Sequence, residues 1–183
     1  VAFDQLTNTA APGQGDVSLT SYSGSIIGGS ITSNGSVSLI AQDSITATGV
    51  AGDGGELNWS VLRAGGSMFV RSLGAAVTVD VVESGGAMTL WAKYDVTFRQ
   101  VKTTGSASDI VLRSDEGAVI ALGTGILNVD AGGSVTMNAA TTITGAEVLD
   151  KYTVRINTSV PDVSLPTNVM HYPTRLLAPD AFN

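Results

Sequence analysis

The sequence has no cysteine, one histidine and only 14% charged residues among its 183 positions. Without cysteine there is no disulfide, no thiol nucleophile and no cysteine-bound metal, and a single histidine leaves carboxylates as the main metal ligands. No apolar run approaches the roughly 18 residues that span a bilayer, and residues 1–10 lack the charged start and apolar stretch of a signal peptide. We therefore expect a soluble polypeptide with no cofactor, no metal site and no membrane insertion.

Helix-forming residues are also scarce, since lysine and glutamate together number only seven. In contrast, serine and threonine number 39, valine and isoleucine 31, and glycine 22. This mixture excludes a helical bundle and indicates many short strands joined by tight turns. The formal charge of −7 and the pI near 4.4 argue against nucleic-acid binding, which needs a concentrated basic surface.

An internal repeat runs through most of the chain. The pattern glycine, polar, apolar, polar, apolar occurs at 15–19, 35–39 and 55–59, so its first glycines are evenly spaced. A second phase of the same pattern begins at Gly66 and Gly86, with the same spacing, and degenerate copies follow. A fixed period of this length is typical of repeat architectures, in which each unit stacks on the next.

The repeat predicts an all-β, single-stranded parallel β-helix (β-solenoid) with coils of roughly 20 residues. No unit can bury its own apolar face, whereas stacked coils pair in register at ~4.8 Å and align inward side chains in ladders. Val17, Val37, Leu57 and Val77 are the expected ladder. An antiparallel sandwich or jelly roll is the alternative, although it does not require an equal spacing of its strands.

The composition changes near residue 148. Four of the five prolines lie after residue 160, and no glycine follows Gly145. Because proline and the loss of glycine both oppose tight β-coils, we expect a β-solenoid domain at 1–147 and a proline-rich tail at 148–183 that caps the coil or docks elsewhere. Residues 152–156 still have the composition of a strand.

Two segments carry a resemblance to a known family. Residues 35–45 (Gly-Ser-Val-Ser-Leu-Ile-Ala-Gln-Asp-Ser-Ile) and 86–96 (Gly-Ala-Met-Thr-Leu-Trp-Ala-Lys-Tyr-Asp-Val) resemble repeats of filamentous haemagglutinin-like, two-partner secretion adhesins. The resemblance covers roughly residues 15–145 and implies a right-handed parallel β-helix that is extracellular, at the bacterial cell surface. The Asn-Pro motifs of that family's secretion domain have no counterpart in this chain.

One outward row of side chains is the candidate binding site. Strand alternation about the apolar residues 68, 88 and 110 points basic and aromatic side chains outward at one place on three successive coils. Cation–π contact would stabilise such a row by ~0.5 to 1 kcal/mol at an exposed site. All six basic residues before the tail lie between Arg63 and Arg113. The candidate ligand-binding residues are Arg71, Trp91, Lys93 and Arg113.

Other motifs receive structural interpretations. Asp115-Glu116 is expected to form a solvated turn and not a catalytic pair, and His171 has no nucleophile motif to serve. Gly52–Glu56 has half of a calcium-binding nonapeptide without the required tandem copies. Ice binding requires threonines on every coil, and Thr46/Thr48 and Thr142/Thr144 are not expected to form such an array. We therefore predict no catalytic residue.

The resulting functional hypothesis is a non-catalytic, extracellular structural and adhesive module of a bacterial surface fibre or adhesin stalk. Its expected partners are a glycan or another host or bacterial surface ligand. The first alternative is a self-assembling filament subunit joined head to tail through the C-terminal tail. The lesser alternative is a polysaccharide-binding or polysaccharide-cleaving β-helix, which would require outward acids that converge on one groove.

Overall fold

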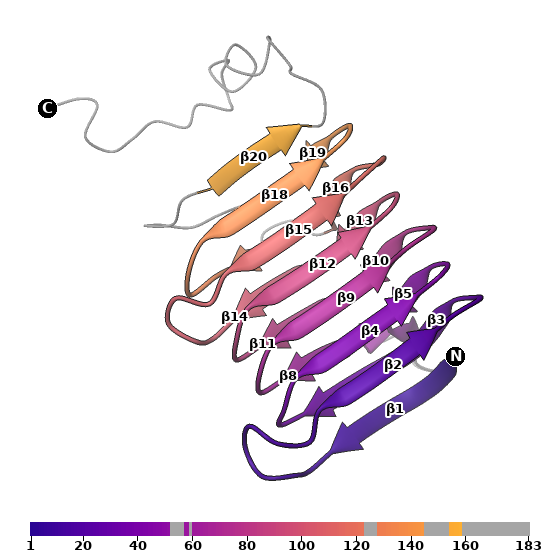
Figure 1. Cartoon of the computed structure of the whole chain (residues 1–183), viewed down its shortest axis with the longest axis vertical. Coiled ribbons are helices and arrows are strands. Elements are labelled where there is room, and N and C mark those ends of the chain that lie inside the picture. Colours follow the sequence, from indigo (N-terminus) through magenta and orange to yellow (C-terminus); the bar gives the residue numbers. More distant parts are fainter. Residues whose placement is uncertain (52–56, 59, 123–127, 145–153, 159–183) are drawn as a thin grey trace, which may run out of the picture.

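The computed structural model describes residues 1–51, 57–58, 60–122, 128–144 and 154–158. The described chain is all-β and winds into a β-solenoid of about 6 turns, with coils about 22 residues apart (Figure 1). Parallel pairing between successive coils confirms the predicted fold and excludes the antiparallel sandwich. His171 and Gly52–Glu56 lie outside the described residues, as does most of the tail.

The first face of the solenoid is a seven-stranded parallel sheet. Each strand contributes one outer and one inner set of side chains, because alternate residues point to opposite sides of a sheet. The strands, in order along the stack, are β2 (Val17–Ser21), β4 (Val37–Ala41), β9 (Met68–Ser72), β12 (Met88–Ala92), β15 (Ile110–Ser114), β18 (Val135–Ala139) and β20 (Val154–Thr158).

The second and third faces are joined into one larger sheet by the long strand β3 (Ile26–Ser33), which also pairs with β1 (Ala2–Asn8). The second face consists of β5 (Ile45–Ala47), β10 (Val77–Val79), β13 (Val96–Phe98), β16 (Val119–Ala121) and β19 (Ile143–Thr144). The third face consists of β8 (Val61–Ala64), β11 (Val81–Ser84), β14 (Gln100–Thr103) and β17 (Val129–Asp130).

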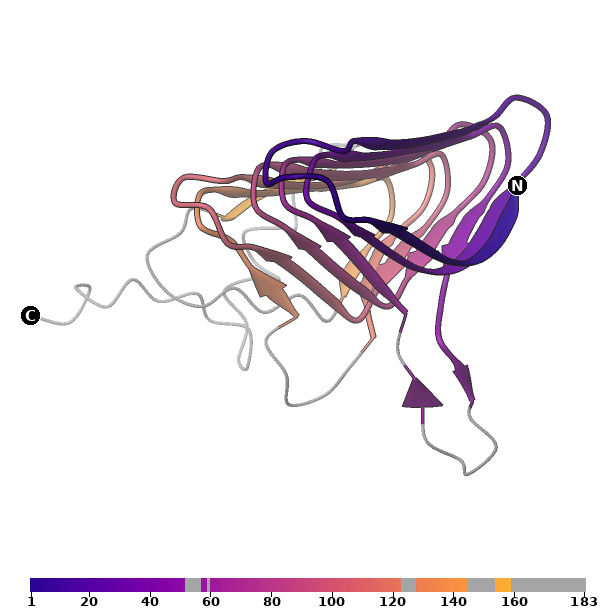
Figure 2. The ribbon, with the colours of Figure 1, turned by 90° about the horizontal axis from the view of Figure 1, so that it is seen from below.

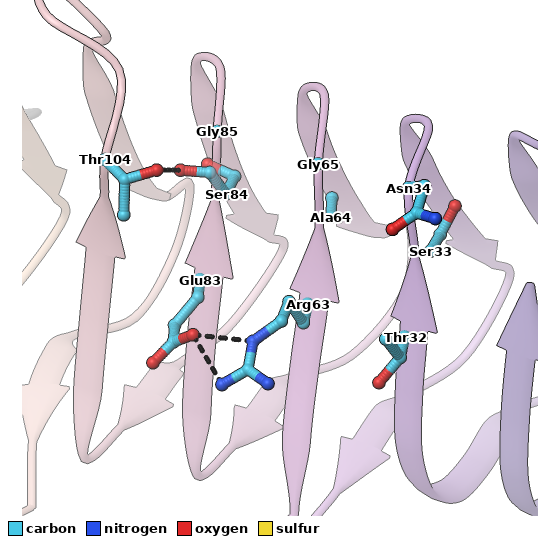
Figure 3. A pocket seen from close by; sticks show the side chains of 10 residues that line it. All are labelled: Thr32, Ser33, Asn34, Arg63, Ala64, Gly65, Glu83, Ser84, Gly85 and Thr104. Carbon is cyan, nitrogen blue, oxygen red and sulfur yellow. Dashed lines mark hydrogen bonds and ion pairs between the residues drawn. The ribbon is translucent and has the colours of Figure 1, made fainter. Parts of the chain in front are cut away.

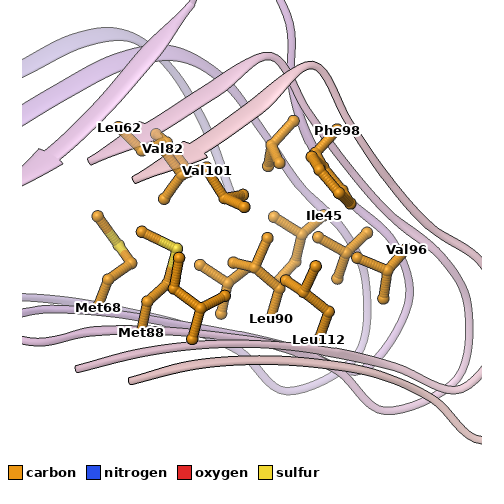
Figure 4. Close-up of a cluster of buried hydrophobic side chains, with 14 of the residues drawn as sticks. Ile45, Leu62, Met68, Val82, Met88, Leu90, Val96, Phe98, Val101 and Leu112 are labelled. Carbon is orange, nitrogen blue, oxygen red and sulfur yellow. The ribbon is translucent and has the colours of Figure 1, made fainter. Parts of the chain in front are cut away.

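The three faces enclose one apolar core. Figure 4 shows inward side chains from the three faces converging in the middle of the coils. Leu62, Val70, Val82, Leu90 and Phe98 are each fully buried. Successive coils place similar side chains above one another, as in the register Met68, Met88 and Ile110. The core is therefore a set of side-chain columns that run along the solenoid axis, as predicted for the inward ladders.

A short excursion leaves the solenoid between the second and third faces. Its two strands, which pair antiparallel and stand away from the coils (Figure 2), are β6 (Val50–Ala51) and β7 (Leu57–Asn58). The carboxylate of Asp80 accepts hydrogen bonds from the backbone N–H groups of Gly49 and Ser60, one on each side of the excursion. Arg99 pairs with the same carboxylate at 3.2 Å. Asp80 is 6% exposed, so a buried anion fixes the base of the excursion.

This excursion overturns part of the predicted ladder. Val17 and Val37 pair as predicted, but the next partner of Val37 is Met68, well beyond the next repeat of the pattern. Leu57 lies in the separate antiparallel pair, and Val77 lies on the second face. The excursion inserts extra residues into one coil. The two phases of the sequence repeat therefore belong to the same ladder of the first face, in which Met68 follows Val37.

Glycines at the corner between the third and first faces are required by close stacking of the backbone. A β-carbon on Gly85 would overlap the carbonyl oxygen of Gly65 on the preceding coil, and one on Gly132 would overlap that of Gly105. Among the described glycines, only Gly13 and Gly15 have positive φ. The corner glycines therefore serve close approach between coils, and not an unusual backbone conformation.

Strand β20 pairs in parallel with β18, from Val135 opposite Val154 to Ala139 opposite Thr158. The parallel ladder therefore continues past residue 147, where the sequence change places the end of the solenoid. The strand overlaps the segment 152–156 that has strand composition. The pairing depends on β18, because an edge strand offers a full row of backbone donors and acceptors with which β20 can form hydrogen bonds.

Candidate functional site

The outer side of the first face carries the row of side chains that the sequence predicts. Arg71 on β9 lies opposite Trp91 on β12, and Trp91 lies opposite Arg113 on β15. The same column extends to Ile40 on β4 and Asn138 on β18. The buried residues of these strands alternate with the column, so the predicted alternation about the inward positions 68, 88 and 110 is confirmed.

Trp91 is stacked between two guanidinium groups. The guanidinium carbon of Arg71 lies 3.8 Å from the centre of the Trp91 ring, and that of Arg113 lies 4.4 Å from it. These two arginines come from the strands on either side of β12, so they cover opposite faces of the indole. The stack fixes both guanidinium planes by cation–π contact, and it leaves neither indole face open for a sugar ring.

Asp115 completes the stack on one side. Its carboxylate accepts a hydrogen bond from Trp91 Nε1 at 2.8 Å and one from Arg113 Nε at 2.6 Å. The solvated turn predicted at Asp115 is confirmed, because this exposed residue lies in a bend after β15, but its contact with Trp91 was not predicted. The signal was present, because Asp115 follows Arg113 by two residues and continues the outward side of the strand. Asp115 therefore neutralises Arg113 and orients the indole.

Lys93 lies in the turn after β12 and not in the column. Its Nζ is 3.9 Å from Glu116 Oε1 and 5.4 Å from the centre of the Tyr94 ring. Asp115 thus compensates Arg113 on its own coil, and Glu116 compensates Lys93 on the preceding coil. The four predicted site residues lie together at one edge of the first face, although nothing in the geometry gives Lys93 the fixed orientation of the arginines.

The third face carries a column of charges of alternating sign. Arg63 pairs with Glu83 at 2.7 Å across β8 and β11 (Figure 3), and Lys102 pairs with Asp130 at 2.7 Å across β14 and β17. The hydrogen bond and charge of Asp130 raise the pKa of Lys102, and Glu83 adds to the same effect. Each charge in this column therefore has a compensating neighbour.

An open groove of about 300 Å³ lies over the same face. Most of the residues that line it have polar side chains, among them Thr32, Asn34, Arg63, Glu83 and Thr104 (Figure 3). The only charged groups in this lining, Arg63 and Glu83, bind each other. The groove therefore offers hydroxyl and amide groups but no uncompensated charge.

The second face carries a short column of threonines that no local motif marks. Thr46, Thr78 and Thr97 lie in register on three successive coils, so an aligned column does exist. The alignment was missed because Thr78 and Thr97 belong to no local threonine motif and the excursion hides the register. Ile27 and Ile120 occupy the same position on the two flanking coils. The column therefore does not provide the threonine on every coil that ice binding requires.

No group of three or more histidine, cysteine, aspartate or glutamate side chains within the described ranges is placed to hold a metal ion. In the same part of the chain, no helix has the length and hydropathy of a membrane span. Three turn aspartates, Asp16, Asp95 and Asp109, accept backbone N–H bonds from the next coil. These carboxylates therefore hold neighbouring coils together.

Comparison with protein-family models, with curated proteins and with solved structures finds no match to this chain.

Proposed function

We propose that this chain is a non-catalytic structural and adhesive module of an extracellular bacterial surface fibre or adhesin stalk. The resemblance of residues 35–45 and 86–96 to filamentous haemagglutinin-like repeats supports the location and the class. The solenoid supports the mechanical role, because neighbouring coils share backbone ladders on three faces and columns of core side chains. Bending such a rod would strain many parallel hydrogen bonds together, so the stack is stiff.

The observation that carries the adhesive part of the proposal is the Arg71–Trp91–Arg113 stack. It spans three successive coils on the outer side of the first face and holds polar N–H groups in fixed planes. A side chain that is already ordered loses little conformational freedom when a ligand binds. The rod thus displays a preorganised contact point on a rigid support.

Adhesion under flow tests this proposal. Beads coated with the purified chain are passed over immobilised bacterial and host surface glycans, and the retained fraction is measured. Retention should fall strongly for Trp91→Ala and remain unchanged for Tyr22→Ala, which removes an aromatic ring that is 89% exposed elsewhere. Equal retention of both variants, or no retention of the unmodified chain, would overturn the adhesive role.

The alternative, a self-assembling filament subunit, is favoured by one observation. Within the described chain β2 pairs only with β4, so its other edge presents unpaired backbone groups to a neighbouring molecule. Negative-stain electron microscopy at rising concentration separates the two proposals, with a shortened chain that ends at Thr158, and so keeps β20, as the comparison. Filaments that disappear in the shortened chain would establish the fibre subunit, whereas isolated rods in both samples would exclude it.

Polysaccharide cleavage has less support. Catalytic carboxylates must be free to take or hold a proton next to the sugar. Four outward acids of the first and third faces, Glu83, Asp115, Glu116 and Asp130, are each engaged by a basic side chain. The exposed acids Asp4 and Asp43 lie on different elements, in β1 and after β4. We therefore propose binding without catalysis.

A further inference from the structure

One basic side chain differs from the others in its pairing. Of the six basic side chains in residues 1–51, 60–122 and 128–144, five lie within 4 Å of a carboxylate, at 2.6 to 3.9 Å: Arg63, Lys93, Arg99, Lys102 and Arg113. Arg71 makes the cation–π contact with Trp91 and, within those ranges, no hydrogen bond or ion pair. In a chain with a formal charge of −7, an arginine without an acidic neighbour is unexpected.

The outward neighbours of Arg71 along its strand and its column are apolar, whereas Ser38 and Thr89 lie opposite Phe69 on the adjacent strands. Ile40 lies opposite Arg71 on one side and Trp91 on the other, and Phe69 precedes it on the outer side of β9. Leu73, just after the strand, is 41% exposed. A guanidinium carries five N–H donors in a fixed fork, and those of Arg71 have no acceptor among the described residues, so they can bind an acidic ligand.

The charges of the stack and its neighbours indicate how much negative charge a ligand group should carry. Asp115 compensates Arg113 and Glu116 compensates Lys93, so one positive charge remains at Arg71. A single planar guanidinium matches a single carboxylate through two parallel N–H to O bonds. A phosphate or sulfate cluster would require further free cations, which these residues do not supply.

We propose that Arg71 binds the carboxylate of an acidic sugar, with the C–H face of the sugar ring packed toward Phe69 and Leu73. This inference rests on the proposed adhesive function and names the class of glycan, a uronic-acid polysaccharide. Arg71 makes the ionic contact, and Trp91 is a positioning residue that holds the guanidinium plane. The indole itself is not the sugar platform, since its two faces are covered by Arg71 and Arg113.

Fluorescence anisotropy with labelled oligosaccharides tests the inference directly. The probes are oligomers of galacturonate, glucuronate and mannuronate, with carboxyl-reduced oligomers as neutral controls. At least one acidic probe should bind, and its neutral counterpart should not. Arg71→Gln should weaken binding at least about tenfold, because a charge-assisted bidentate contact is lost. Arg63→Gln, which removes a paired arginine on the third face, should change affinity less than about twofold.

Two further variants separate positioning from charge. Arg71→Lys keeps the charge but loses the planar fork and should also weaken binding. Trp91→Phe keeps an aromatic ring beneath the guanidinium and should bind better than Trp91→Ala. Far-ultraviolet circular dichroism of each variant confirms that the solenoid remains folded.

Several outcomes would overturn the inference. These are failure of all three acidic probes to bind, equal weakening by Arg71→Gln and Arg63→Gln, or binding of the neutral oligomers. If Arg71→Gln instead abolishes self-association in sedimentation velocity, the carboxylate belongs to a second copy of the chain and the sugar assignment is wrong. If bead adhesion persists while every acidic probe fails, the adhesive function stands and only the uronic-acid assignment falls.

Discussion

The first and third faces both present basic side chains to solvent, but they differ in whether acidic side chains compensate the positive charge. On the third face Arg63 and Lys102 alternate with Glu83 and Asp130, and each base binds an acid on the adjacent coil. On the first face an indole separates two arginines, and one of them, Arg71, has no acid among the described residues. In a solenoid the register decides whether a charge is compensated, because residues about one coil apart in the sequence become nearest neighbours.

This difference suggests that compensated charges serve the fold and the uncompensated charge serves binding. If that is right, removing a compensated charge should cost stability in proportion to its burial. Removing the first-face stack should cost little stability but much affinity.

The largest effect is expected for Asp80→Ala. Its carboxylate is buried, holds both sides of the excursion and pairs with Arg99, whose charge would remain without that partner. We expect a loss of about 3 kcal/mol in the free energy of unfolding, measured by chemical denaturation. Asp4→Ala is the control, since Asp4 is exposed. A loss below that of the exposed third-face pairs would contradict the ranking by burial.

Trp91→Ala should have an intermediate effect on stability. Two cation–π contacts and the hydrogen bond to Asp115 are lost from a partly exposed site, so we expect a loss of about 1 kcal/mol. Thermal denaturation followed by circular dichroism measures this change, with Tyr22→Ala as the matched control. A loss as large as that of Asp80→Ala would show that the stack is mainly a structural element.

Glu83→Gln should have a smaller effect. The Arg63 and Glu83 side chains are 54% and 30% exposed, so their pairing contributes only about 0.5 kcal/mol. The loss should almost vanish in 1 M salt, where the Debye length falls to about 3 Å. Chemical denaturation at low and high salt measures both values. Weakened binding to the acidic sugars would contradict the separation of the two faces.

The smallest effect is a pH dependence from Lys102. Asp130 raises its pKa above the ordinary value of 10.5, so the folded state holds this proton more tightly than the unfolded state does. The resulting stability is fully present below the unfolded pKa and is lost as the pH rises through the folded pKa. The stability difference between the unmodified chain and Lys102→Gln should therefore be constant near neutral pH and shrink above about pH 10. A difference that grows with pH would contradict this assignment.

Several features could be predicted from the sequence because they depend on local pattern. The alternation of apolar and polar residues defines which side chains point inward, and the regular repeat indicates stacked parallel coils. The alignment of Arg71, Trp91 and Arg113 follows from the same two periodicities and is confirmed. Their role in binding a ligand remains a prediction.

Other features escaped prediction because they depend on which coils become neighbours. The excursion between β5 and β8 lengthens one coil and shifts the register. As a result, Leu57 lies outside the expected ladder. The alignment of the threonines was not predicted for the same reason. A parallel stack tolerates such insertions because the entropic cost of a longer surface loop grows slowly with length. No local pattern marks the residue at which the chain rejoins the coil.

Local sequence patterns are therefore sufficient to predict the class of fold, the inward and outward sides of the strands and the stacked row on the first face. Coil stacking instead brings Asp115 to the Trp91 indole, places Asp80 at the base of the excursion and leaves Arg71 without an acid in the described chain. The physical reason is that periodicity is a property of each strand. Four of the five ion pairs in the described chain instead join residues on different coils, and register brings those residues together.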